Sequence, residues 1–191
     1  MKKVAYIIPG GFESVRQKPY KEIATFFKAK GIEPIPVEIS WKHRTMNDYV
    51  NQFMKIYRNN PSEEVYLLGF SFGAMVAFIS SAKIKPKMQI LCSLSPFFKE
   101  DLPSWKNWQK RILGKKRVED LKNYSFNYLS RKVFCETKLI VGSKELKVVI
   151  KRSNEANKRL KNSEIIISKG AKHKISQKEY LKTVQKVISG I

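Results

Sequence analysis

The stretch Glu64–Ala77, which reads EVYLLGFSFGAMVA, passes directly from a strand-like run to a helix-like run. Between the apolar residues Val65–Leu68 and the helix-competent residues Ala74–Ser81 lies the pattern G-x-S-x-G, centred on Ser71. Such a turn needs glycine on both sides, because it holds the serine at positive φ and a larger side chain would clash. The pattern predicts an activated serine above a sheet edge, at the positive end of a helix. The alternative is a glycine-rich turn with an idle serine.

Strand-like and helix-like segments alternate along the whole chain. The predicted strands are Val4–Ile8, Ile35–Ile39, Val65–Leu68, Met88–Leu94, Lys138–Val141 and Glu164–Ile167. The predicted helices are Tyr20–Lys30, Asn47–Arg58, Ala74–Ser81, Asn154–Leu160 and Gln177–Ile188. Six strands separated by helices predict an α/β fold with a mostly parallel six-stranded sheet and helices on both faces.

Length and composition favour one domain, residues 1–191. The chain has 191 residues, of which 42% are hydrophobic, enough for one substantial core. No apolar run approaches a membrane span, and we find no signal-like segment, so we expect a cytoplasmic protein. The two cysteines, Cys92 and Cys135, make neither a disulfide framework nor a metal-ligand cluster, so we expect buried thiols. Chemistry at the predicted activated serine implies no metal or organic cofactor.

The charge is strongly basic. Thirty-eight Lys and Arg residues against sixteen Asp and Glu give a formal net charge of +22. Such a surface attracts polyanions. The lysines are scattered, however, with no arginine block, RNA-binding motif or zinc-finger spacing, so we expect no specific nucleic-acid binding. An anionic partner or substrate that uses the basic surface remains an open alternative.

The loop after the first strand contains Gly10, Gly11 and Phe12. In a parallel sheet, functional groups gather beyond the carboxyl ends of the strands. Backbone N–H groups of Gly11 or Phe12 can point at a bound carbonyl, and the N–H of Phe72, directly after the serine, supplies the other half of an oxyanion hole. The alternative is a tight turn that uses its glycines only for their dihedral angles.

Two later strand ends carry a carboxylate and an imidazole. Glu145 follows the strand predicted at 138–141, and His173 follows the strand predicted at 164–167. Acyl transfer needs a base near neutral pKa to take the serine proton, and a carboxylate to fix the tautomer of that base. We therefore predict a catalytic triad of Ser71, Glu145 and His173.

Each member of this triad has a plainer interpretation. Glu145 can be a surface acid paired with a neighbouring lysine, and His173 can be a solvated loop histidine. The only other histidine, His43, lies in a polar stretch early in the fold, where we expect a surface role.

Taken together, these motifs resemble the α/β-hydrolase superfamily over nearly the whole chain. The matching segments are GGF at 10–12, GFSFGA at 69–74, GSKE at 142–145 and GAKH at 170–173. The resemblance implies a nucleophile elbow at Ser71 followed in chain order by an acid and a histidine. The chain departs from many members in three ways. It has Gly10 or Pro9 where they carry an oxyanion-loop histidine, Glu145 where Asp is usual, and no room before Val4 for a two-stranded start.

A long segment, Ser95–Thr137, separates two of the predicted strands and is the predicted lid. It is rich in aromatic and basic residues and has the length of two or three short helices. Its aromatic side chains can wall an acyl pocket above the serine. The predicted substrate-binding residues are Phe70, Phe97, Phe98, Trp105 and Trp108. The alternative is that these side chains only bury the small helices against the sheet.

The sequence thus predicts a serine hydrolase that cleaves an ester or thioester bond of a small acyl substrate through an acyl-enzyme on Ser71. Three alternatives use the same scaffold. These are acyl transfer or thioester cleavage on an anionic carrier, cleavage of peptide bonds, and binding without catalysis.

Overall fold

The computed structural model of the protein describes residues 2–191 and contains a six-stranded sheet. The strands are β1 (Lys3–Ile8), β2 (Glu33–Pro36), β3 (Glu64–Phe70), β4 (Met88–Cys92), β5 (Glu136–Gly142) and β6 (Ser163–Ser168). Their order across the sheet is β2-β1-β3-β4-β5-β6, and every neighbouring pair is parallel. All carboxyl ends therefore open onto one edge, and the predicted α/β fold is confirmed.

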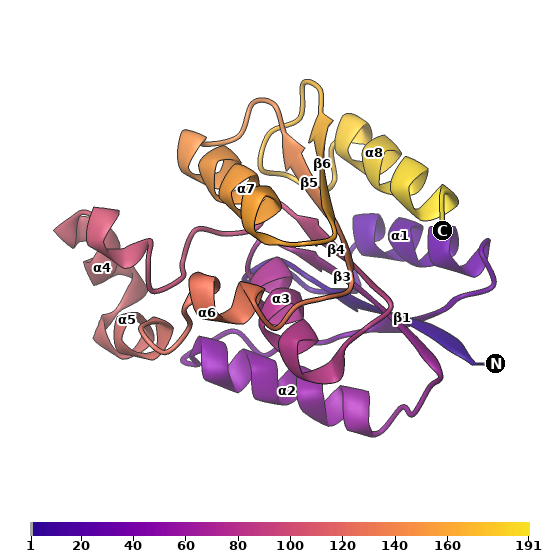
Figure 1. The fold of residues 1–191 in the computed structure, drawn as a ribbon, viewed down its shortest axis with the longest axis horizontal. Coiled ribbons are helices and arrows are strands. Elements are labelled where there is room, and N and C mark those ends of the chain that lie inside the picture. The colour runs from indigo at the N-terminus through magenta and orange to yellow at the C-terminus, as the bar shows by residue number, and fades with distance from the viewer. Residues whose placement is uncertain (1) are drawn as a thin grey trace.

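Helices cover both faces of this sheet (Figure 1). The helices between and after the strands are α1 (Lys18–Lys28), α2 (Met46–Arg58), α3 (Phe72–Ile84), α7 (Lys147–Arg159) and α8 (Lys178–Ser189). Helices α1 and α8 pack on one face, where Phe27 and Val184 are fully buried with the strand residues Ile7 and Leu68. Helices α2, α3 and α7 pack on the other face. Burying both faces explains why the central strands read as continuous apolar runs.

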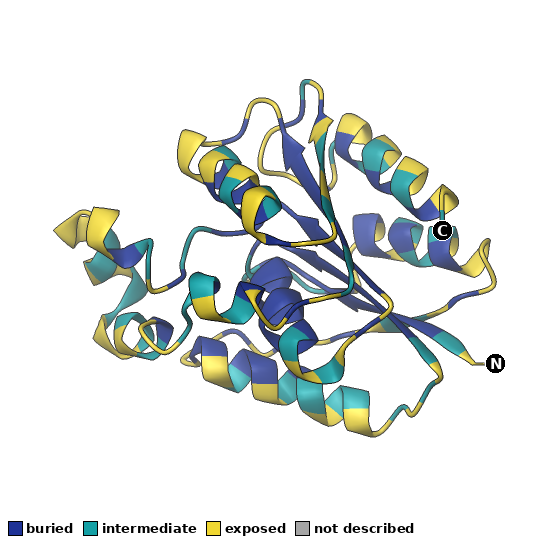
Figure 2. Cartoon of the chain, viewed as in Figure 1, coloured by how far each residue is buried: buried dark blue, intermediate teal, exposed yellow. Residues whose placement is uncertain are grey.

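Helix α3 is the most deeply buried helix of the fold (Figure 2). Its residues from Gly73 to Ser81 are all buried, because α3 lies against β3 and β4 beneath α2 and the small helix α6 (Phe126–Ser130). A helix that is apolar on all sides belongs in such a position. The close packing of α3 therefore also fixes the position of the elbow that precedes it.

Most elements differ from the sequence-based boundaries by one to three residues, and two of the differences have a clear physical cause. Strand β2 covers Glu33–Pro36 rather than 35–39, and its two prolines are tolerated because β2 is an edge strand. Helix α7 starts at Lys147, seven residues earlier than predicted. Its first turns contain Val148, Val149 and Ile150, whose β-branched side chains favour a strand.

The segment between β4 and β5 forms three short helices and one 3₁₀ turn. These are η1 (Leu102–Ser104), α4 (Asn107–Leu113), α5 (Lys115–Leu121) and α6. Since β5 begins at Glu136, the segment spans 93–135 rather than 95–137. Helices α4 and α5 project from the body at the end away from both termini (Figure 1). Among residues 2–191, no helix is both long and apolar enough to cross a bilayer.

Candidate active site

Ser71 lies at the sharp turn between β3 and α3. Its backbone has φ 55° and ψ −116°, a conformation that costs free energy for a residue with a side chain. A Cβ on Gly69 would lie 2.2 Å from the Gly73 carbonyl oxygen, and a Cβ on Gly73 would lie 2.3 Å from the Pro9 carbonyl oxygen. Both glycines are therefore required by close backbone contacts, and they hold the serine at the carboxyl edge of the sheet.

Ser71, His173 and Glu145 form a continuous hydrogen-bonded line. Ser71 Oγ lies 3.0 Å from His173 Nε2, and His173 Nδ1 lies 2.6 Å from Glu145 Oε2. An ionised carboxylate only accepts hydrogen bonds, so Nδ1 carries the ring hydrogen and Nε2 accepts from the serine hydroxyl. This is the geometry that a general base needs in order to take the serine proton.

The loops that carry the acid and the base are bound directly to each other. The backbone N–H of Lys144 donates to the Ala171 carbonyl at 2.9 Å, and the N–H of Gly170 donates to Ser143 Oγ at 2.8 Å. A Cβ on Gly142 would lie 2.4 Å from the Ala171 oxygen, so only glycine permits this approach. The short distance between Glu145 and His173 follows from this contact between neighbouring strand ends.

Glu145 has two further partners that sequence reasoning did not find. The Ser93 hydroxyl and the Gly142 N–H, the latter at 3.1 Å, both donate to Oε1 of Glu145. Ser93 in turn lies 2.6 Å from the Tyr180 hydroxyl, whose single hydrogen can point to Ser93 or to the Ile140 carbonyl, 3.0 Å away. Burial raises the pKa of Tyr180 well above its ordinary value, so its hydroxyl remains a donor. The Glu145 side chain is thus fully buried yet hydrogen-bonded at both oxygens.

Phe70 supports the histidine. Its ring is buried, with its centroid 5.1 Å from that of His173 and 5.9 Å from that of Tyr180. The assignment of Phe70 to the substrate wall is corrected, since its position on β3 directs the ring under the imidazole.

A second hydroxyl lies beside the nucleophile. Ser95 Oγ is 3.1 Å from Ser71 Oγ, and both residues are buried. Ser71 gives its hydrogen to His173, so Ser95 is the donor in this pair. Ser93 and Ser95, two residues apart after β4, therefore contact opposite ends of the triad.

The predicted oxyanion donors lie in two neighbouring loops, since a Cβ on Gly11 would lie 2.8 Å from the Phe72 ring. The N–H of Phe72 is the first of helix α3 and has no partner within the helix. The N–H groups of Gly11 and Phe12 make no hydrogen bond to any described residue. Tyr20 fixes the loop, because its hydroxyl accepts from the Gly10 N–H at 2.8 Å and donates to Glu13. Three N–H groups are thus free to stabilise a negative oxygen.

Three of the five non-glycine residues with positive φ among residues 2–191 lie at this edge of the sheet, and the other two are His43 and Lys85. Phe12, Ser71 and Ser93 have φ values of 63°, 55° and 51°. Each follows a different strand, and each borders the triad or its oxyanion loop. Strained non-glycine residues persist where the surrounding structure determines them, and they cluster at functional sites.

A row of aromatic rings leads away from the serine. The ring of Phe97 stacks on Phe72 with centroids 4.8 Å apart, and Trp105 meets Phe97 edge-on at 4.5 Å. Beside Phe72 lies a narrow slot of about 20 Å³. Its lining residues are Gly11, Phe12, Trp41, Met46, Tyr49, Phe72, Leu113, Arg117 and Leu121. Most of these were not identified from the sequence, because they come from four separate stretches, 11–12, 41–49, 72 and 113–121.

Two other predicted pocket residues lie elsewhere. Phe98 is fully buried in the core, where its ring packs 5.5 Å from Phe78 and 5.3 Å from Phe126. Its assignment to the pocket wall is corrected, because the chain turns at Phe97 and directs the next side chain inward. Trp108 is 55% exposed on α4 and does not line the slot.

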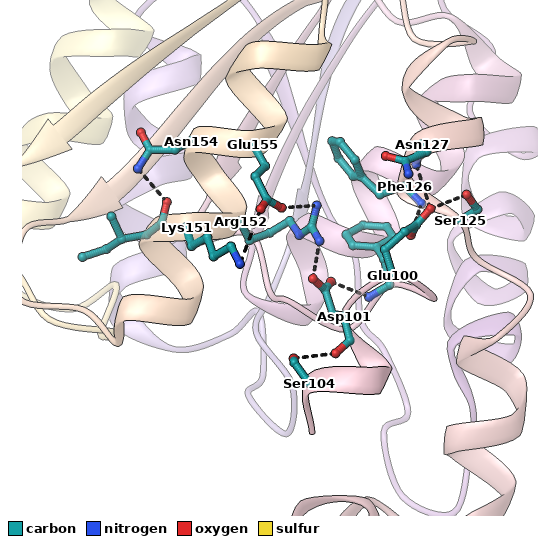
Figure 3. Close-up of polar contacts among 12 residues, drawn as sticks. Glu100, Asp101, Ser104, Ser125, Phe126, Asn127, Lys151, Arg152, Asn154 and Glu155 are labelled. Carbon is teal, nitrogen blue, oxygen red and sulfur yellow. Dashed lines mark hydrogen bonds and ion pairs between the residues drawn. The ribbon is translucent and has the colours of Figure 1, made fainter. Parts of the chain in front are cut away.

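The root of the inserted segment is anchored by ion pairs and hydrogen bonds (Figure 3). The buried guanidinium of Arg152 on α7 binds Asp101, lies 3.3 Å from Glu155 and stacks 4.9 Å from the centre of the Phe126 ring. Glu100 accepts from two backbone N–H groups at the start of α6, at 2.9 and 3.1 Å. Only the part that carries α4 and α5 extends beyond these anchors.

These positions give opposite expectations for two aromatic residues of the inserted segment. Phe98→Ala is expected to destabilise the fold by about 3–5 kcal/mol without changing acyl-chain preference, since it empties a core site. Trp105→Ala is expected to shift the preferred acyl length, by about 1–3 kcal/mol per methylene, with a smaller loss of stability. Melting temperatures measured beside a short-to-long acyl ester series check both. An unchanged length profile in Trp105→Ala would remove the aromatic row from the substrate site.

Three other features of the described residues do not indicate a second reactive site. A hollow of about 560 Å³ lies at the amino ends of the strands, away from the triad, where Lys87 pairs with Glu64 and Lys138 with Glu164 at 2.8 Å each. No group of three His, Cys, Asp or Glu side chains within 2–191 is arranged to hold a metal ion. Burial raises the pKa of the Cys92 thiol, which makes it a poor nucleophile.

Comparison with solved structures identifies the fold. Est1E from Butyrivibrio proteoclasticus matches with a TM-score of 0.86 at 14% identity, over 99% of this chain and 88% of that chain. Alpha/beta hydrolase domain-containing protein 10 from mouse matches with a TM-score of 0.76 at 14% identity, over 98% and 88%. A bromoperoxidase from Bacillus anthracis matches with a TM-score of 0.76 at 12% identity, over 99% and 91%. The sequence matches no protein-family model and no curated protein significantly.

The chain therefore has the α/β-hydrolase fold, as its motifs predict. The neighbours include an esterase from Pyrococcus furiosus, with a TM-score of 0.73 at 15% identity, as well as the bromoperoxidase. One scaffold thus carries proteins named for different reactions, and the chemistry of this chain has to be argued from its own site.

Proposed function

We propose that the chain is a serine hydrolase that cleaves an ester or thioester bond of a carboxylic acyl substrate through a covalent intermediate on Ser71. The observation that carries this proposal is the hydrogen-bonded line from Ser71 through His173 to the buried Glu145, with spacings of 3.0 and 2.6 Å. Free backbone N–H groups beside the serine support it, because a triad without an oxyanion site stabilises the transition state poorly.

The residues divide the reaction between them. Ser71 Oγ attacks the carbonyl carbon as His173 Nε2 takes its proton, and Glu145 stabilises the resulting imidazolium. The N–H groups of Phe72 and of Gly11 or Phe12 bind the oxygen that becomes negative. His173 then protonates the leaving alcohol or thiol, and water, deprotonated by the same imidazole, releases the acid and restores Ser71.

A screen of p-nitrophenyl esters and acyl thioesters of increasing chain length tests this function. We expect turnover of at least one series, and stoichiometric labelling of Ser71 by a fluorophosphonate, which reacts only with an activated serine. A thioester preference with a salt-sensitive Michaelis constant would favour an anionic acyl carrier as substrate. Absence of both turnover and labelling would favour a binding protein on this scaffold.

Glu145→Gln is expected to lower kcat roughly 10,000-fold, less than the loss of Ser71 or His173. The glutamine amide cannot stabilise the imidazolium and favours the wrong tautomer of His173. Steady-state kinetics on the best ester measure the loss.

Glu136→Gln is the matched control, because Glu136 pairs with Lys138 on the sheet and does not contact the triad. It is expected to keep full activity. Wild-type activity in Glu145→Gln would show that the acid is not Glu145.

A further inference from the structure

The tip of the inserted segment, residues Lys106–Arg117, presents two large apolar side chains to solvent. Trp108 is 55% exposed and Ile112 is 76% exposed. They are four residues apart on α4, so they lie on the same side of the helix, one turn from each other. No residue of α4 is buried, and the helix stands at the outer end of the molecule (Figure 2).

Six basic residues lie in the same segment as this apolar pair, and the tip contains no acidic residue. They are Lys106, Lys110, Arg111, Lys115, Lys116 and Arg117. None of them forms an ion pair with any residue in 2–191. The acidic residues that border the tip do not neutralise it, since Glu119 pairs with Lys122. Asp48, whose pKa is lowered by the Thr45 N–H and in part by Lys116, forms no ion pair with that lysine. The tip therefore keeps its positive charge.

We propose that this tip docks the protein on an anionic lipid surface, with Trp108 and Ile112 inserted at the boundary between headgroups and acyl chains. A short cluster of four to eight basic residues beside exposed Trp and aliphatic side chains is the composition that such surfaces attract. Nucleic acid would leave Ile112 exposed, because an aliphatic side chain cannot stack on a base. A folded acidic partner would need a groove that fits a protruding helix, whereas a lipid interface accepts a convex one.

The same tip also contributes to the slot beside the elbow. Leu113 and Arg117 line this slot together with Phe12 and Phe72, and Phe72 directly follows Ser71 in the chain. Arg117 is held there by donating to the Arg44 carbonyl at 2.8 Å. With the tip docked, the slot residues Leu113 and Arg117 would lie close to the lipid surface. The consequence that acyl substrates come from that surface rests on the proposed function, but the docking itself does not.

Co-sedimentation with lipid vesicles tests the docking. Wild-type protein is expected to bind vesicles of phosphatidylcholine with about a third phosphatidylserine, and pure phosphatidylcholine at least about tenfold more weakly. Trp108→Ser/Ile112→Ser is expected to weaken binding about tenfold or more. Lys110→Glu/Arg111→Glu is expected to weaken it about 30-fold or more. Ser71→Ala is expected to bind like the wild type, so a failed enzyme assay and failed docking are told apart.

Matched variants separate the tip from the general charge of +22. Lys178→Glu/Lys182→Glu on α8 removes the same charge far from the tip and is expected to bind like the wild type (Figure 1). Val148→Ser, at a residue 53% exposed on α7, controls for the apolar pair. Equal losses at α8 and at the tip would overturn the proposal. So would unchanged binding after Trp108→Ser/Ile112→Ser, or retention by duplex DNA or an acidic polypeptide but not by anionic vesicles.

Discussion

Replacing Ser71 with alanine is expected to abolish fluorophosphonate labelling and to reduce acyl-ester turnover by roughly a million-fold, to the level that the remaining binding groups sustain. The oxygen is lost from the one side chain that is held on a strained turn and hydrogen-bonded to His173 at 3.0 Å. We expect the melting temperature to stay the same or to rise, since nucleophiles are placed for reactivity rather than stability. Labelling followed by intact-mass analysis and a thermal melt measure both effects.

Ser95→Ala provides the sharpest control, because its hydroxyl lies only 3.1 Å from that of Ser71. Ser95 does not lie on an elbow and does not contact His173 through any described hydrogen bond. We expect the Ser95→Ala variant to be labelled, at a rate lowered by about tenfold or less, the worth of one hydrogen bond. Labelling that persists in Ser71→Ala and disappears in Ser95→Ala would show that Ser95, and not Ser71, is the nucleophile.

The sequence was sufficient to predict the sheet and the elements that carry the triad. The strands are local apolar runs, and in a parallel sheet their carboxyl ends meet at one edge, so residues 71, 145 and 173 could be brought together without coordinates. The elbow was predictable because the close backbone contacts of this turn require glycine at two positions, and the whole pattern lies within five residues.

The groups that support the triad could not be predicted in this way. Ser93, Ser95 and Tyr180 are ordinary residues in sequence, and only the packing of β4 against β5 and α8 places them beside Glu145 and Ser71. The slot could not be predicted either, because its walls come from segments as distant as Trp41 and Leu113. Such contacts depend on tertiary structure, for which one sequence carries no local signal.

The positions of the aromatic residues of the inserted segment could not be predicted from the sequence either. Phe97 and Phe98 are neighbours of the same residue type, yet Phe98 is in the core while Phe97 is only partly buried and stacks on Phe72. Trp108 is neither core nor slot. A hydrophobic side chain in a short irregular segment has no periodicity that assigns it to a face, so burial could not be read from the pattern.

Replacing His173 with alanine is expected to lower kcat about as much as the loss of Ser71, roughly a million-fold, because members of a triad act as a unit and their effects do not add. Without the imidazole, Ser71 has no acceptor for its proton, and Glu145 is left fully buried without the ring that it orients. The imidazole side chain is 36% exposed, so the space it leaves is open to solvent. Added imidazole is therefore expected to restore a measurable part of the activity in proportion to its concentration.

His43→Ala is the control for the only other histidine, which is exposed in the loop before α2. It is expected to retain wild-type kinetics, and added imidazole should not change them. The comparison discriminates between a general base and a structural role for His173. A structural role predicts a lower melting temperature with no rescue by imidazole, whereas a base predicts rescue on an intact fold. If His173→Ala kept more than about a tenth of the wild-type kcat, a loss far smaller than a general base supplies, the proton would have to pass to another group and the proposed mechanism would fail.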